Sequence, residues 1–452
     1  MKIIVVGCGK IGRTVISSLV AEGHDVTAID REAAVIEEIT NLHDVMGVCG
    51  NGADCETLEE AGVKDTELFL SATDSDEMNM LACFLAKRMG ASHTIARIRN
   101  PEYNDKSLRF MRNELGLDMA INPELLAARE LFRILRLPSA AKVETFSGRN
   151  FEMVEIKLKA DSLLDGLSLI ELRKKYQVTL LVCAVQRGDK VFIPDGNFIL
   201  RSGDRIGIAA QPAEISKFFK MLGIMQKQAK NVMILGASKT AFYLAKMLLS
   251  AGSNVKIIEM DPVRCAQFSE ELPGAVIING DGAQQELLLE EGIRDTDAFV
   301  SLTGKDEENI LISYFVSTLE VPKIITKVNR KEFILMAENL GAESIITPRK
   351  IIANILVKYA RGLHNSLGSK VETLHKVMGS EAELLEFIVQ PDCALIGTTL
   401  RELDTKPGTL IAGIIRGRKT IIPTGDDHLQ TYDKVIVLSS TPGMNDLSEI
   451  LN

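Results

Sequence analysis

Three glycines near the start of the chain have the spacing of a phosphate-binding turn. Gly7, Gly9 and Gly12 form the pattern G-x-G-x-x-G immediately after the apolar run Lys2–Val6. In a strand–turn–helix unit, the first glycine permits the tight turn, the second lets a pyrophosphate approach the backbone, and the third lets the helix pack on the strand. The N–H groups and the positive dipole end of the helix attract the phosphates. The pattern therefore predicts a site for NAD or a related adenine nucleotide.

An acidic residue lies where the adenosine ribose of such a ligand is expected. Asp30 ends the next predicted strand, 30 − 7 = 23 positions after the first glycine, and a carboxylate there accepts hydrogen bonds from the ribose hydroxyls. Its charge would repel a 2′-phosphate, which favours NAD over NADP, although the neighbouring Arg31 weakens that preference. We expect further contacts from the turn and from loops at the carboxyl ends of other strands, namely Cys8, Lys10, Ile11, Asn51, Gly52, Thr73, Asp74 and Arg97.

The turn recurs in the second half of the chain in altered form. Gly236 follows Gly7 at a shift of 236 − 7 = 229 positions, and Glu259 follows Asp30 at the same shift. Ser238 replaces the second glycine, where its side chain crowds a pyrophosphate but its hydroxyl is also able to donate to one. The second turn is therefore expected to bind nucleotide more weakly, to select another nucleotide such as ATP or ADP, or to be vestigial, and we favour an occupied site. Its candidate residues are Gly236, Ala237, Ser238, Lys239, Thr240, Glu259, Asp281, Thr303 and Lys327.

The turns must be positioned by alternating strands and helices. Short apolar runs at Lys2–Val6, 25–29, 69–72 and His93–Arg97 read as strands, and amphipathic stretches at 11–22, 33–41, 56–61 and 77–89 read as helices. Strand–helix alternation indicates a parallel sheet with helices on both faces. A smaller unit follows, with strands near 151–158, 180–186, 190–193 and 205–210 and one helix near 167–175. Because the pattern repeats along the chain, the sequence predicts an α/β fold of two tandem Rossmann-like doubly wound parallel sheets, each followed by a small α+β domain.

The repeat also sets the expected domain boundaries. We place Rossmann-like nucleotide-binding domains at 1–122 and 230–347, helices opened by Pro123 and Pro348 at 123–138 and 348–363, and small α+β domains at 143–225 and 370–452. The helices that join sheet to small domain are the natural moving joints of such a chain.

Composition excludes several classes of protein. The net charge of −9 argues against a nucleic-acid binder, and no apolar run approaches the ~20 residues that span a bilayer. The seven cysteines are scattered without a C-x-x-C pair, and the six histidines form no close cluster, so neither disulfides nor a metal site is indicated. These features suit a soluble cytoplasmic protein whose tie to a membrane would run through a partner.

The chain resembles the double-length regulator-of-potassium-conductance proteins, the nucleotide-binding subunits of bacterial Trk potassium-uptake systems. The resemblance covers nearly the whole chain and rests on the segments KIIVVGCGKIGRTV, SATDSDEMNMLAC, NPELLAARELFRIL, SLLDGLSLIELR, VFIPDGNFILRSGDRI, ALIGTTLRELDT and TIIPTGDDHLQTYDKV. It implies a homotetrameric ring, peripheral on the inner face of the membrane, beneath a potassium-translocating subunit of the TrkH or TrkG type. It also implies that NAD(H), ATP or ADP at the two turns changes the ring and gates uptake.

The alternative is an NAD-dependent oxidoreductase, because a Rossmann-like fold does not by itself imply one function. Hydride transfer requires a proton donor or acceptor facing the nicotinamide. The small domains, at 151–215 and 384–440, contain one histidine, His428, and no set of acid, base and substrate clamp. A third function, that of a nucleic-acid-binding redox sensor, is disfavoured by the negative net charge and by the lack of a recognisable DNA-binding helix pair. The sequence thus favours a ligand-sensing module without catalytic residues.

Overall fold

The computed structural model describes residues 1–100, 103, 105–136, 142–146, 151–188, 190–224, 228–342, 344–365, 371–378, 382–441, 443–444 and 446–452. Its contacts divide the chain into two compact units. The first contains Met1–Arg129 and Thr347–Ala360, and the second contains Glu130–Ile346 and Arg361–Asn452. The helix within Thr347–Ala360 therefore belongs to the first unit although it follows the second glycine turn in the sequence.

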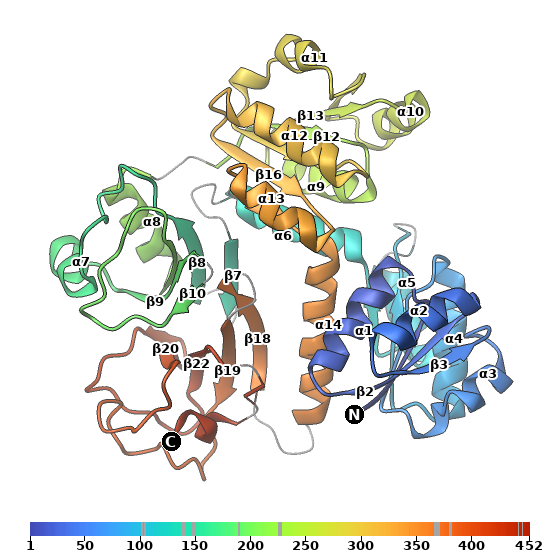
Figure 1. Cartoon of the computed structure of the whole chain (residues 1–452), viewed down its shortest axis with the longest axis horizontal. Helices are drawn as coiled ribbons and strands as arrows, with labels where there is room; N and C mark the ends of the chain where they lie inside the picture. The colour runs from blue at the N-terminus through green and yellow to red at the C-terminus, as the bar shows by residue number, and fades with distance from the viewer. Residues whose placement is uncertain are drawn as a thin grey trace. The chain divides into compact units, whose positions relative to one another are not determined.

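The first unit is built on a six-stranded parallel sheet in the order β3-β2-β1-β4-β5-β6. The strand order reverses between β1 and β4. The carboxyl ends of these two strands therefore form the switch point at which open α/β sheets bind ligands. The strands are β1 (Lys2–Val6), β2 (Asp25–Asp30), β3 (Met46–Cys49), β4 (Leu68–Ser71), β5 (His93–Arg97) and β6 (Met119–Ile121). The helices are α1 (Lys10–Ala21), α2 (Ala33–Leu42), α3 (Cys55–Glu60), α4 (Asp76–Met89) and α5 (Asp105–Leu115) (Figure 1).

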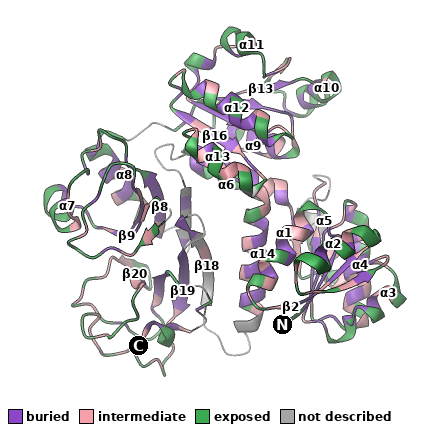
Figure 2. Ribbon diagram, in the orientation of Figure 1, coloured by how far each residue is buried: buried purple, intermediate pink, exposed green. Residues whose placement is uncertain are grey.

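Local sequence explains the central elements of this sheet. The four residues after Lys2 in β1 are all buried, as expected for a strand with helices on both faces. Helix α1 buries Gly12, Val15, Ile16 and Leu19, which lie on one face at helical spacing. Figure 2 shows these strands buried between helices whose outer faces are exposed.

The second unit contains the duplicate sheet, in the order β14-β13-β12-β15-β16-β17. Its strands are β12 (Asn231–Leu235), β13 (Asn254–Glu259), β14 (Val276–Asn279), β15 (Ala298–Ser301), β16 (Lys323–Lys327) and β17 (Ser344–Ile346). Its helices are α9 (Lys239–Ser250), α10 (Pro262–Glu271), α11 (Gln285–Glu290), α12 (Asp306–Ser317) and α13 (Lys331–Asn339). The strand order and parallel pairing match those of the first sheet, which confirms the predicted pair of Rossmann-like sheets.

Two small antiparallel sheets complete the second unit, in the orders β10-β9-β11-β8-β7 and β18-β19-β22-β20-β21. The first comprises β7 (Lys142–Phe146), β8 (Phe151–Lys157), β9 (Leu180–Arg187), β10 (Lys190–Phe192) and β11 (Arg205–Ala210), with α7 (Leu169–Tyr176) and α8 (Pro212–Met221). The second comprises β18 (Val371–Val377), β19 (Ala382–Ile388), β20 (Thr409–Arg416), β21 (Lys419–Ile421) and β22 (Lys434–Ser439). Both sheets belong to small domains of the predicted α+β kind. The two sheets share an apolar core that includes Phe151, Met153, Leu384 and Ile436.

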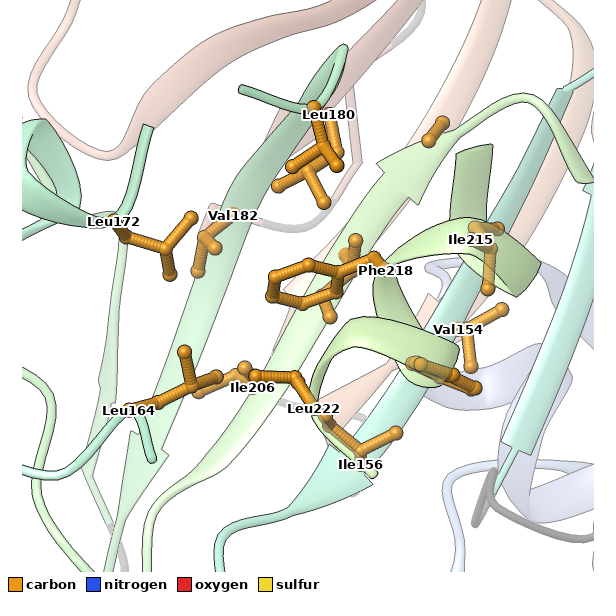
Figure 3. Close-up of a cluster of buried hydrophobic side chains, with 14 of the residues drawn as sticks. Val154, Ile156, Leu164, Leu172, Leu180, Val182, Ile206, Ile215, Phe218 and Leu222 are labelled. Atoms are coloured by element: carbon orange, nitrogen blue, oxygen red, sulfur yellow. The ribbon is translucent and has the colours of Figure 1, made fainter. Parts of the chain in front are cut away.

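The first small domain has its own core beneath its helices. Phe218 of α8 is fully buried among Leu172, Val182 and Ile206 (Figure 3), and its ring packs edge-on against Tyr176 with centroids 5.6 Å apart. An arginine–aspartate pair recurs in both small domains. Arg187 donates two hydrogen bonds of 2.8 Å to Asp204, and Arg416 does the same to Asp433 at 2.9 and 2.8 Å.

Two helices opened by proline follow the large sheets, α6 (Pro123–Arg136) and α14 (Pro348–Asn365). The Asn122 side chain accepts a hydrogen bond of 2.9 Å from Leu125 N and so caps α6. By its contacts α6 is divided, because residues up to Arg129 belong to the first unit and residues from Glu130 belong to the second. No helix in the described part of the chain is both long and apolar enough to cross a lipid bilayer.

Candidate functional site

Two of the three glycines in the first turn are required by close packing. Gly7 has φ +85°, and a Cβ on it would lie 2.8 Å from the backbone nitrogen of Thr73. A Cβ on Gly12 would lie 2.0 Å from the carbonyl oxygen of Gly7. Gly9 differs from both, because an added Cβ would meet no described atom within 4 Å and its backbone is extended at φ −68°. Gly9 thus leaves open the approach to the helix N-terminus that a phosphate would use.

The Asp30 carboxylate stabilises the turn. Its Oδ2 accepts a 2.7 Å hydrogen bond from Cys8 N, and its Oδ1 accepts a 3.1 Å bond from Glu32 N. Each carboxylate oxygen has two lone pairs, so each can accept a further bond from a ribose hydroxyl. The Cys8 thiol donates to the carbonyl of Ile29 at 3.5 Å, and burial, reinforced by Asp30, raises its pKa to about 12. Cys8 therefore faces the turn with its backbone N–H rather than with a reactive thiolate.

The predicted residues on the β2–β3 side of the turn are held by contacts within the protein. Arg31 donates a 2.9 Å hydrogen bond to Asn51 Oδ1, and the same oxygen accepts a bond from Ala53 N. A Cβ on Gly52 would lie 2.1 Å from Cγ1 of Val6, so this glycine is required by packing against β1. The Arg31–Asn51 bond joins the ends of two neighbouring strands beside Asp30.

Residues of the helix start complete the turn. Helix α1 begins at Lys10, whose side chain is exposed, and Ile11 is half-buried. Arg13, which the sequence pattern did not single out, donates a 3.0 Å hydrogen bond from Nε to the Cys8 carbonyl and pairs with Glu38. The turn is thus held from both sides by charged groups, the Asp30 carboxylate on its N–H and the Arg13 guanidinium on its carbonyl.

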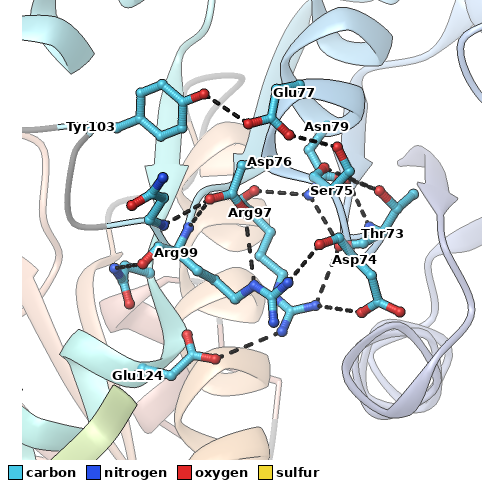
Figure 4. A network of polar contacts seen from close by, with 12 residues as sticks. Thr73, Asp74, Ser75, Asp76, Glu77, Asn79, Arg97, Arg99, Tyr103 and Glu124 are labelled. Carbon is cyan, nitrogen blue, oxygen red and sulfur yellow. Dashed lines mark hydrogen bonds and ion pairs between the residues drawn. The ribbon is translucent and has the colours of Figure 1, made fainter. Parts of the chain in front are cut away.

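The loops after β4 and β5 meet on the other side of the turn (Figure 4). Thr73 lies against Gly7 and donates from both its N–H and its hydroxyl to Asn79 Oδ1, at 2.8 and 2.7 Å. Asp74 is fully exposed and lies 3.8 Å from Nη1 of Arg97. The structure therefore brings Gly7, Thr73, Asp74 and Arg97 to one edge of the sheet.

A buried asparagine positions these loops, although it was not among the site residues predicted from the sequence. Asn79 is completely buried, and its Oδ1 also accepts a 3.0 Å bond from Ser71 Oγ. Its Nδ2 donates to the carbonyl oxygens of Thr73 and Arg97, at 3.2 and 2.9 Å. The recurrence of this asparagine as Asn309 within the repeat was the signal that would have identified it.

The second turn reproduces the geometry of the first. Gly236 has φ +94°, and Glu259 accepts hydrogen bonds from Ala237 N at 2.7 Å and from Asp261 N at 2.9 Å. Ser238 has φ −85° and ψ 162°, close to the extended conformation of its counterpart in the first turn. Its Oγ accepts a 3.3 Å bond from Ala241 N and caps α9. This cap occupies an N–H group at the helix start, while the hydroxyl keeps its own proton as a donor.

The remaining predicted residues of the second site occupy equivalent places. Thr303 donates from its N–H and hydroxyl to Asn309 Oδ1 at 3.0 and 2.9 Å, and Lys327 Nζ donates to the Thr303 carbonyl at 2.7 Å. Asp281 Oδ1 accepts a 3.0 Å bond from Ala283 N. In α9, Lys239 is exposed and Thr240 is buried. Over the described residues, no group of three or more histidine, cysteine or acidic side chains is arranged to hold a metal ion.

Comparison with known proteins agrees with this duplicated architecture. The TrkA-N domain family matches residues 3–123 and 232–348, and the TrkA-C domain family matches residues 153–223 and 384–452. Among solved structures, the chain is similar to the GsuK channel bound to NAD, with a TM-score of 0.63 at 17% identity over 98% of this chain and 77% of that one. It is equally similar to the GsuK RCK domain, with a TM-score of 0.63 at 16% identity over 98% and 93%. At these identities the likeness concerns the fold.

Full-length relatives have higher identity. The chain is 32% identical over 450 residues to the Trk system potassium uptake protein TrkA homolog of Archaeoglobus fulgidus, covering 100% of both chains. It is 29% identical over 446 residues to Trk system potassium uptake protein TrkA of Haemophilus influenzae, covering 97% of this chain and 96% of the relative. With both domain families present twice and the similarity extending from end to end, the chain belongs to the TrkA family of Trk-system potassium uptake proteins.

Proposed function

We propose that this chain is a cytoplasmic nucleotide-sensing subunit that gates a membrane potassium-translocating partner of the TrkH or TrkG type. The observation that carries the proposal is the pair of glycine turns, each closed by a carboxylate, in a chain similar over its whole length to Trk-system potassium uptake proteins. The chain would lie on the inner face of the membrane through that partner. Its domains would follow the expected division, with nucleotide-binding domains at 1–122 and 230–347.

The ligands proposed for the turns are NAD(H), ATP and ADP. Asp30 and Glu259 supply acceptors beside the turns, and the helix N-termini supply donors to phosphate. The GsuK structures with which the chain shares its fold include one bound to NAD, and another with a TM-score of 0.51 bound to ADP. A family member with the same paired turns would bind nucleotides as signals in the same crevices.

Gating follows from linkage between nucleotide binding and conformation. A nucleotide shifts an equilibrium between two conformations only by the difference in its affinity for them. Moving a population from 1:99 to 99:1 requires an affinity ratio of about 10⁴. In a homotetramer with eight glycine turns, the overall ratio would be the product of the ratios at the individual sites, so each site would need only a modest difference in affinity between the two conformations. The proline-opened helices α6 and α14 are the elements that would carry the change.

The alternative of an oxidoreductase has less support from the described residues at the turns. Thr73 and Asn51 are engaged in hydrogen bonds that hold loops, and the Cys8 thiol is neutral and buried. An enzyme would require a proton donor or acceptor placed over the nicotinamide. A regulatory role needs only binding and a change of shape.

A combined binding and transport experiment tests the proposal. Calorimetric titration of the purified full chain should show binding of NADH and ATP, and Asp30→Ala should weaken it while the control Asp25→Ala, at the exposed opposite end of β2, should not. In potassium-uptake-deficient cells that carry a Trk membrane subunit, Asp30→Ala should alter uptake. The proposal is wrong if the wild-type chain binds none of these nucleotides, or if its presence leaves uptake unchanged.

A further inference from the structure

Arg97, at the carboxyl end of β5, is a largely buried cation with weak partners. Its side chain is 11% exposed. Nη1 donates one long hydrogen bond of 3.4 Å to the Thr73 carbonyl, and Nε makes no hydrogen bond to any described residue. Burial, with a contribution from Arg99, lowers the pKa of the Arg97 guanidinium, but an arginine remains charged at neutral pH. A guanidinium with five N–H donors is therefore held largely by ion pairs.

Glu124, the acidic residue that faces Arg97, is also weakly paired. Glu124, in the first turn of α6, has a side chain that is 20% exposed, and its Oε1 lies 3.9 Å from Nη2 of Arg97. Its Oε2 is buried and has no hydrogen-bond partner among the described residues. By contrast, Arg187 and Asp204 in the first small domain form two hydrogen bonds of 2.8 Å. The Arg97–Glu124 pair is thus a loose ion pair in a place where a tight one would be expected to form.

The pair lies next to the glycine turn. Thr73 connects them, because its backbone nitrogen abuts Gly7 and its carbonyl accepts from Arg97. In this sheet order, an adenosine at Asp30 lies on the β2 side of the turn, so the rest of the ligand extends across β4 toward β5. Figure 4 shows the Arg97 guanidinium between Asp74 and Glu124 at this edge. The part of the ligand beyond the first phosphates would therefore meet Arg97.

Resting on nucleotide binding at the first turn, we propose that Arg97 exchanges Glu124 for the terminal phosphate of a nucleoside di- or triphosphate. A phosphate offers several charged oxygens in the geometry that a guanidinium binds best. A dinucleotide has no terminal phosphate, so its second nucleoside leaves the Arg97–Glu124 pair in place. The released Glu124 is tolerated at the start of α6, where the helix dipole favours an acid. Because α6 runs from the first unit into the second, this exchange reports the class of ligand to the rest of the chain.

The second copy lacks this pair of charges. Lys327 corresponds to Arg97 and donates to the carbonyl oxygens of Thr303 and Leu302 at 2.7 and 3.5 Å. The residue at the position of Glu124 in α14 is Arg349, since Thr347-Pro348-Arg349 repeats Asn122-Pro123-Glu124. The second copy therefore has a lysine and an arginine at the positions where the first copy has an arginine and a glutamate. The exchange is therefore a property of the first site, and the second site supplies a matched control.

Titrations of the full chain with ADP, ATP and NADH test the exchange. Glu124→Gln removes the competing charge, so it should tighten ADP and ATP binding by about tenfold, the scale of one charge-assisted hydrogen bond, and change NADH by less than twofold. Arg97→Gln should weaken ADP and ATP by at least as much. In the double variant the gain from Glu124→Gln should disappear. Lys327→Gln should leave the first site unchanged.

The outcomes separate this inference from the function on which it rests. If the wild-type chain binds nucleotides but Glu124→Gln leaves the three affinities unchanged, or weakens them together, the exchange is refuted and nucleotide sensing stands. If both single variants lower the melting temperature and weaken all three ligands alike, the pair is structural and the exchange is again wrong. If the wild-type chain binds no nucleotide, both proposals fail. Opposite effects on ADP affinity from the two single variants support the exchange.

Discussion

Replacing Gly9 by alanine should separate nucleotide binding from folding. The added methyl would meet no described atom within 4 Å, and φ −68° with ψ −166° is open to alanine. The methyl would instead project into the approach to the first N–H groups of α1. By contrast, Gly12→Ala would place Cβ 2.0 Å from the Gly7 carbonyl oxygen and should damage folding and binding together.

The expected magnitudes differ sharply for the two properties. Alanine restricts the unfolded chain and so gains about 0.4–1 kcal/mol of stability, but it is a poorer N-cap than glycine by a similar amount. The net change in unfolding free energy at Gly9 is therefore within ~1 kcal/mol. Loss of a single charge-assisted hydrogen bond to phosphate, worth about 1.5–3 kcal/mol, would weaken binding roughly 10- to 150-fold.

Isothermal titration with NADH and ADP, together with urea unfolding of the same preparations, measures both quantities. A suitable control is Gly362→Ala, a second glycine whose Cβ would meet nothing within 4 Å and whose substitution within α14 should raise stability without affecting nucleotides. Wild-type affinity and stoichiometry in Gly9→Ala would refute the placement of the phosphates. A large loss of stability would refute the claim that the space at Gly9 is open.

Three further predictions follow from the turns and their supports. Ser238→Gly releases Ala241 N from its cap, so it should cost a few tenths of a kcal/mol and tighten the second site in titrations; unchanged affinity would show that the cap does not compete with ligand. Asn79→Ala strips the partners from several buried groups, so urea unfolding should show a loss of about 3 kcal/mol or more, and a loss below ~1 kcal/mol would contradict its central role. Burial raises the folded pKa of Cys8 from near 9 to about 12. Its contribution to stability is therefore full below pH 9 and falls by about 1.4 kcal/mol per pH unit above it. Unfolding curves of wild-type and Cys8→Ala should diverge between pH 9 and 11, and parallel curves would count against this.

The sequence predicted those features that depend on local spacing. Gly7 is required by its close approach to Thr73, and Gly12 is required by its close approach to Gly7. The G-x-G-x-x-G pattern predicted both glycines, and the repeat keeps the first of them as Gly236. The fold class followed for the same reason, since alternating strands and helices leave few topologies. Gly52 was selected as a possible ligand contact, whereas the structure shows a packing reason for it in Val6.

The features that escaped prediction depend on contacts between distant segments. Asn79 acts by joining the loop after β4 to the end of β5, 18 residues further along the chain, and no periodicity encodes that. Strands β6 and β17 have three residues each, too few for an alternation to be read. Helix α5 is largely polar, but its few apolar residues keep helical spacing, so this helix was open to prediction from the sequence. The sequence pattern likewise does not show that most of α14, up to Ala360, belongs to the first unit.

The placement of α14 bears on how such a chain could have arisen. Its buried residues, among them Ala353, Leu356 and Val357, lie in the segment that joins the first unit by contact although it is encoded in the second half. If a half-length ancestor had the same arrangement, most of the helix corresponding to α14 would have packed on the nucleotide-binding unit of a second molecule. Gene fusion would then have converted this contact between identical subunits into an intramolecular one, leaving each half free to diverge, as Ser238 already has from Gly9.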